Sequence, residues 1–179
     1  MKDKFSSGER AFTGFSMPHW NELPEIDLYI DQVTSLVNRH LPDFATGPKG
    51  ALTATMVNNY VKAKIIPSPV KKKYNRDTVA MLFVVVTLKP LFNIQEIGEL
   101  IQATISEHDV NEAYDIYRNT LEQAFDRVQR NQVPIKWYTE DHTLNIVENV
   151  CAAIAYQTDA KYRLAERRQP ENHSQSTAK

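Results

Sequence analysis

The sequence has a single cysteine, Cys151, among 179 residues, so it can form neither an internal disulfide nor a cysteine-based zinc site. Only five glycines and nine prolines interrupt it, and long helices are therefore expected. The longest apolar run, residues 79–86, is far shorter than the roughly 20 residues that cross a bilayer. Residues 1–15 also lack the apolar core of a signal peptide. We therefore expect a soluble, cytoplasmic protein with no membrane partner.

The chain contains no recognisable enzymatic motif. Its five histidines are scattered without a pair at metal-ligand spacing, and no phosphate-binding glycine loop or nucleophile elbow occurs. Glu140, Asp141 and His142 form an acidic cluster, but we expect Thr139 to cap a helix there. The dipole of that helix explains acids in its first turn. We therefore predict a protein that is not an enzyme and that has no cofactor and no metal site.

Apolar residues recur at helical spacing through most of the chain, which predicts an all-α protein of about six helices. The expected helices cover residues 25–41, 54–64, 76–89, 94–104, 110–130 and 140–166. Capping residues mark four of their starts: Thr53, Asn75, Asn93 with Glu96, and Asp109 with Glu112. The helix at 76–89 is apolar on nearly all sides, so it should lie at the centre of the core.

Positive charge is concentrated in residues 44–76, which contain seven Lys or Arg and no Asp or Glu. The whole chain has 21 Lys and Arg against 22 Asp and Glu, a net charge of −1. The other residues together therefore carry −8 (−1 minus +7). A basic segment in a nearly neutral protein is typical of a surface that binds a polyanion.

This basic segment combines a polar helix face with a predicted wing. Four polar side chains of the expected helix 54–64 recur at i, i+3, i+4 and i+7: Thr55, Asn58, Asn59 and Lys62. In a major groove, Asn pairs with adenine, while Lys reaches guanine or phosphate. The prolines of residues 65–69 should turn the chain, and residues 70–74 should return as the second arm of a small β-hairpin. A solvated helix face and a hairpin edge protected by lysines are the plainer interpretations.

The segment resembles the MerR-type helix-turn-helix. That family has a capping residue, a central tyrosine, two aliphatic residues and a proline at the spacing of Thr53, Tyr60, Ile65, Ile66 and Pro67. The basic wing, the capped helix after it and the phrase FNIQEI extend the likeness over residues 52–101. The family carries arginine where this chain has Thr55 and Asn58, tyrosine where it has Asn59, and a longer wing. The wider chain also resembles an uncharacterised bacterial family of MerR-like proteins with a domain of unknown function.

The resemblance implies an N-terminal arm at 1–20 and a MerR-like winged helix-turn-helix at 21–105. A helical cover and dimerisation region at 106–168 and a disordered tail at 169–179 would follow. The implied protein is a transcriptional regulator, a homodimer on double-stranded DNA, with a small-molecule effector as a further partner. The predicted DNA contacts are Thr53, Thr55, Asn58, Asn59, Lys62, Lys64, Lys71, Lys72, Lys73, Tyr74 and Arg76. The alternative is a helical module that uses the same basic face for an acidic protein partner or RNA.

Overall fold

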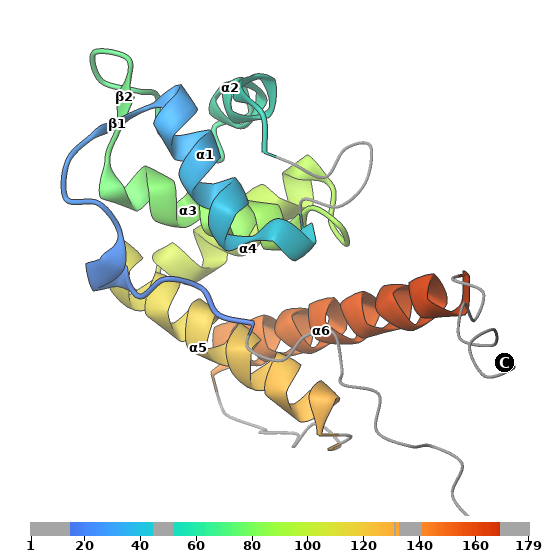
Figure 1. Ribbon diagram of the computed structural model, residues 1–179. Helices are drawn as coiled ribbons and strands as arrows, with labels where there is room; N and C mark the ends of the chain where they lie inside the picture. Colours follow the sequence, from blue (N-terminus) through green and yellow to red (C-terminus); the bar gives the residue numbers. More distant parts are fainter. Residues whose placement is uncertain (1–14, 45–51, 131, 133–140, 169–179) are drawn as a thin grey trace, which may run out of the picture.

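The computed structural model of the protein describes residues 15–44, 52–130, 132 and 141–168. Within these ranges six α-helices and one two-stranded sheet form a mostly helical protein, which confirms the predicted all-α class (Figure 1). The helices are α1 (Ile30–His40), α2 (Ala54–Lys62), α3 (Arg76–Leu88), α4 (Ile94–Ile105), α5 (Val110–Gln129) and α6 (His142–Arg168). The strands are β1 (Leu28–Tyr29) and β2 (Lys73–Tyr74), which pair antiparallel. The predicted tail at 169–179, most of the predicted arm and Thr139 lie outside the described residues.

Helix α3 forms the centre of the core. Asn75 begins it by accepting a hydrogen bond from the backbone N–H of Thr78, as the sequence predicts. Helices α1, α4 and α5 pack around it, and Leu82, Phe83 and Val85 are fully buried, with 0% of their surface exposed. Because α3 buries nearly all its sides, the two halves of the described chain share one hydrophobic core.

Helices α5 and α6 pack along each other on the far side of α3 from α1 and α2 (Figure 1). Leu121 and Phe125 on α5, with Cys151 and Ile154 on α6, are buried between these elements. The hydroxyl of Tyr117 lies 2.7 Å from that of Thr87 on α3, inside the core. Helix α5 thus covers α3, as its apolar pattern predicts.

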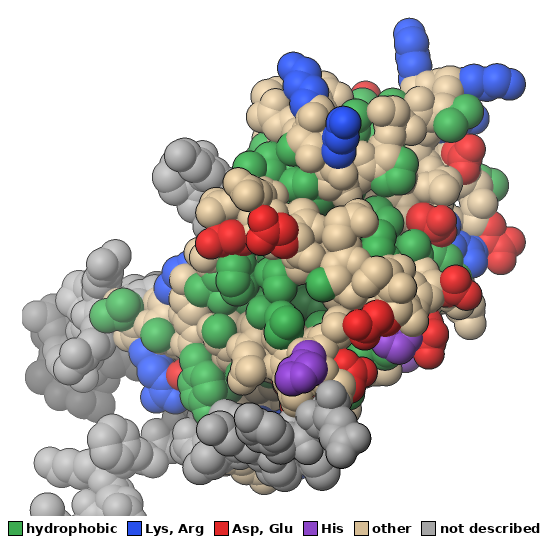
Figure 2. Space-filling view, turned by 180° about the vertical axis from the view of Figure 1, so that it is seen from behind, with side chains coloured by type: hydrophobic (Ala, Val, Ile, Leu, Met, Phe, Trp, Pro, Cys, Tyr) green, Lys and Arg blue, Asp and Glu red, His purple; other side chains and the backbone are tan. Residues whose placement is uncertain are grey.

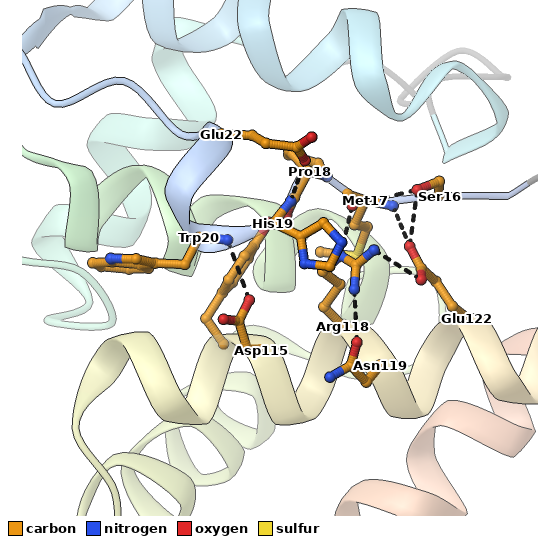
Figure 3. Close-up of polar contacts among 11 residues, drawn as sticks. Ser16, Met17, Pro18, His19, Trp20, Glu22, Asp115, Arg118, Asn119 and Glu122 are labelled. Carbon is orange, nitrogen blue, oxygen red and sulfur yellow. Dashed lines mark hydrogen bonds and ion pairs between the residues drawn. The ribbon is translucent and has the colours of Figure 1, made fainter.

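An N-terminal strap, defined here as residues 16–20, runs across α5 (Figure 3). The buried guanidinium of Arg118 donates to the carbonyl of Met17 (2.7 Å) and pairs with Glu122 (3.0 Å). Glu122 also accepts from the backbone N–H of Met17 (2.9 Å). The hydroxyl of Tyr114 donates to the carbonyl of Pro18 (2.8 Å). The strap has no regular secondary structure, so these side chains satisfy backbone N–H and C=O groups that a helix or sheet would otherwise satisfy.

The structure differs from the predictions at the start of α1, at the cap of α5 and at the cap of α6. The helix expected at 25–41 begins at Ile30, because Leu28 and Tyr29 pair with β2 instead. Asp109 precedes α5, but its side chain makes no capping hydrogen bond. At α6, Asp141 accepts from the backbone N–H of Leu144 (2.9 Å) and so caps that helix. The boundaries of α3 and α4 lie within one residue of those predicted.

Candidate nucleic-acid interface

Helix α2 presents the predicted polar face to solvent. Thr53 caps it, since its hydroxyl accepts from the backbone N–H of Met56 (3.2 Å). Val57 and Tyr60 are buried and hold the opposite face against the core. Five of the predicted contact residues are exposed along this element: Thr53, Thr55, Asn58, Asn59 and Lys62. Neither α2 nor the residues up to Arg76 contain an acid, so the face carries positive charge alone.

The end of α2 places Lys64 in an unusual backbone conformation. The N–H of Ile65 bonds to the carbonyl of Tyr60, and the N–H of Lys64 bonds to that of Val61 (both 3.0 Å). This pair of backbone hydrogen bonds is a Schellman motif. In that motif the residue at the position of Lys64 has a left-handed backbone and is usually glycine. Lys64 occupies it with a φ of 58° and is exposed.

The predicted wing is a different hairpin from the one that the prolines suggested. Val70 and Lys73 exchange two backbone hydrogen bonds of 2.9 Å, so the turn consists of Lys71 and Lys72. Their φ values are 50° and 65°, as a type I′ turn requires. The expectation of a proline turn, with the lysines along the return arm, is therefore wrong. The turn places two exposed lysines at its tip, and β2 pairs with β1 rather than with residues 65–69.

Three predicted contact residues have structural roles. The ammonium of Lys73 lies 5.0 Å from the centre of the Tyr29 ring, a cation–π contact across the sheet. Tyr74 is buried in the core. Arg76 pairs with Glu25 (3.3 Å) and stacks on the ring of Trp20 (5.6 Å), and its side chain is 19% exposed. These contacts join Lys73 and Arg76 to Tyr29, to Glu25 and to Trp20 at the end of the strap, and no local sequence pattern predicts them.

The remaining predicted cations gather at one end of the molecule. Helix α2 and the two-stranded β1–β2 sheet lie on the side of α3 away from α5 and α6 (Figure 1). In Figure 2, Lys and Arg side chains project from this end, whereas most acidic side chains lie farther down the molecule. The four exposed lysines of this end, here called the lysine cluster, are Lys62, Lys64, Lys71 and Lys72.

A second group of polar side chains lies where α4 turns into α5. Ligand atoms of Glu107, His108 and Asp141 lie within 4.8 Å of one another. Each has a structural partner: Glu107 accepts from Thr143 (3.0 Å), His108 faces Glu112 (3.3 Å), and Asp141 caps α6. The group therefore joins the start of α6 to the α4–α5 turn. Sequence spacing could not show it, because Asp141 lies more than 30 residues after Glu107 and His108.

The fold and this charged end define a mostly helical protein with one basic face. The sequence pattern of the family described as Domain of unknown function (DUF1836) matches residues 18–128, and the chain belongs to that family. The match spans β1 to α5 and includes the entire lysine cluster. No curated protein and no solved structure matches the chain. Among the described residues, no helix has the length and apolar character needed to cross a membrane.

Proposed function

We propose that the protein binds double-stranded DNA through α2 and the lysine cluster, and that it acts as a transcriptional regulator of the MerR-like type. The observation that supports this proposal most directly is the backbone conformation of the lysines. All three non-glycine residues with positive φ in the described chain are lysines of this cluster. Lysine has no special tolerance for the left-handed region, which Gly, Asn and Asp adopt more readily. Backbone strain concentrated on exposed cations supports a function for their charge.

In this proposal the parts of the interface have separate tasks. The exposed face of α2 enters the major groove, where Asn58 and Asn59 read base edges. The lysine cluster contacts phosphates on both sides of the groove, which positions the helix without reading sequence. Lys73, Tyr74 and Arg76 support the hairpin rather than touch DNA, because of their contacts within the protein.

We further propose that the regulator is a homodimer. One short helix and four lysines offer few contacts, and helix-turn-helix proteins commonly add a second half-site through a partner. Three large side chains of α6 are exposed, Ile146 (44%), Tyr156 (45%) and Leu164 (53%), and support α6 as the self-association element. Replacement of Tyr156 by Glu should shift the sedimentation of the protein towards the monomer. Unchanged sedimentation would exclude α6 from this role.

The decisive test is binding of fluorescent duplexes selected from genomic fragments, measured by anisotropy over a range of salt concentrations. Four phosphate contacts in each protomer predict a slope of log K against log salt of about −3.6 per protomer. Asn58→Ala/Asn59→Ala should keep this slope but lose the preference for the selected duplex over random DNA. The matched control is Asn149→Ala, which removes an exposed Asn from α6 and should change neither quantity.

Two outcomes would contradict the proposal. A protein that binds no duplex at low salt is not a DNA-binding protein. A protein that binds RNA or an acidic peptide more tightly than any duplex is the helical interaction module that the same basic face would also suit. Equal weakening on every duplex by Asn58→Ala/Asn59→Ala would reject base reading alone.

A further inference from the structure

An apolar hollow lies between α3, α4, α5 and α6, away from the lysine cluster. Figure 2 shows it as a green depression in the middle of the face seen there. The hollow has a volume of about 50 Å³ and is partly open to solvent, so it suits a small molecule. All four helices contribute to its wall, among others through Met81, Val84, Leu100, Val110 and Val147.

The polar groups of this wall are already paired within the protein. The hydroxyl of Tyr114 donates to the carbonyl of Pro18, and that of Tyr117 is bonded to Thr87. The hydroxyl of Thr104 donates to a backbone carbonyl of its own helix (2.9 Å). Each hydroxyl of the wall is thus already engaged within the protein. A polar or charged ligand would lose its hydration there without compensation.

The surroundings also disfavour an anionic occupant. Glu107, Asp109 and Glu112 follow closely after the lining residue Ile105, at the turn between α4 and α5. Acidic side chains border the green depression in Figure 2. A carboxylate at this end of the hollow would lie among like charges.

We propose that this hollow binds a small uncharged apolar molecule no larger than a single substituted aromatic ring. Burial of the apolar ligand surface drives the binding, and shape alone sets the selectivity. Met81 is the adaptable part of the wall, since its unbranched side chain changes rotamer easily. The proposal does not depend on DNA binding, because the hollow and the lysine cluster share no residue.

Toluene is a suitable probe. In the full-length protein, toluene should shift the methyl NMR signals of the lining residues and leave those of β1, β2 and α2 unchanged. At about ten times its dissociation constant it should raise the melting temperature by roughly 3 °C. Absence of both effects in the folded protein would overturn the proposal.

Two variants that fill the hollow locate the site. Val84→Phe and Leu100→Phe each add bulk at a partly buried lining position, where a larger side chain can be accommodated. Both should abolish the toluene shifts. The matched control is Ile94→Phe on α4, outside the lining, which should keep them. Shifts that persist in either folded filling variant would overturn the proposal. So would a wild-type dimer that dissociates in Val84→Phe but is unaffected by toluene, because the hollow would then be a contact between two copies of the chain.

Discussion

Replacing the three lysines that have a left-handed backbone should separate the charge of the basic segment from its fold. Lys64, Lys71 and Lys72 have φ values of 58°, 50° and 65°. The triple variant Lys64→Gly/Lys71→Asn/Lys72→Gly gives each position a residue that prefers this conformation. Glycine suits the end of α2, and Asn-Gly is the favoured sequence of a type I′ turn. The variant removes three positive charges and no apolar contact.

The expected result for stability is a gain. A left-handed conformation costs an ordinary residue roughly 1–2 kcal/mol, and glycine removes this cost. The greater freedom of glycine in the unfolded chain offsets about 0.5–1 kcal/mol of the gain. The net gain is therefore about 0.5–1 kcal/mol per position and about 2 kcal/mol in all. For a chain of 179 residues this raises the melting temperature by roughly 4–8 °C. Differential scanning calorimetry would measure it.

The expected result for DNA binding is a loss. The variant keeps only Lys62 of the lysine cluster, so the salt slope should fall in magnitude from about −3.6 to about −0.9 per protomer. A rise in salt from 50 to 200 mM, which weakens the native protein about 150-fold at that slope, should weaken the variant only about 3.5-fold. Fluorescence anisotropy on one duplex over this range would give both slopes.

The matched control is Arg130→Gln/Lys161→Gln/Arg163→Gln, which neutralises three exposed cations on α5 and α6. It removes two exposed ion pairs, so its stability should fall by at most about 1 kcal/mol and its salt slope should not change. A stabilised triple lysine variant with the native slope would refute phosphate contact by the lysine cluster. A triple variant less stable than the native protein would refute the strain argument.

Three further substitutions test the fold. Thr53→Ala removes the bond that caps α2 and should cost about 1 kcal/mol in urea unfolding, and no loss would show that this cap is dispensable. Burial raises the pKa of the Cys151 thiol, and a nearby carboxylate raises it further. Native Cys151 should therefore resist iodoacetamide at pH 8, and rapid alkylation would contradict its burial. The folded state keeps the thiol proton to higher pH than the unfolded state does. The free energy of unfolding that Cys151 contributes is therefore fully present below the unfolded thiol pKa of about 8.5 and declines as pH rises above it. Cys151→Ala should reduce this decline. Arg118→Met removes the ion pair with Glu122 and leaves the carbonyl of Met17 without its donor, which should cost about 3 kcal/mol, against at most about 0.5 for Arg130→Met on the surface.

The helices and most of their caps could be predicted because their causes are local. Apolar spacing and the side chains of Thr53, Asn75 and Asn93 act within a few residues, and the structure has all three caps. The start of α1 could not be predicted in the same way. Residues 25–29 continue the helical pattern, but Leu28 and Tyr29 bond to a strand more than 40 residues later. A long-range backbone pairing outweighs a local preference there.

The lysine cluster was predictable by charge but not by conformation. A Lys-Lys pair is not a typical turn sequence, whereas prolines are. The sequence therefore predicts the turn at the prolines at 67 and 69, but the turn lies at Lys71 and Lys72. The supporting roles of Lys73 and Arg76 depend on Tyr29, Trp20 and Glu25, which local patterns do not connect with them. Similarly, no sequence pattern indicated the hollow, because its wall comes from four helices.

The strap has a consequence for the order in which the chain folds during synthesis. Met17 leaves the ribosome early, but its partners Arg118 and Glu122 follow 101 and 105 residues later. At synthesis rates of about 5–20 residues per second, Arg118 and Glu122 are made roughly 5–20 s after Met17. In that interval β1 can already pair with β2, so we expect the basic hairpin to form before the N-terminus is fixed. Docking of the strap is then a late, high-contact-order step that completes the folded domain.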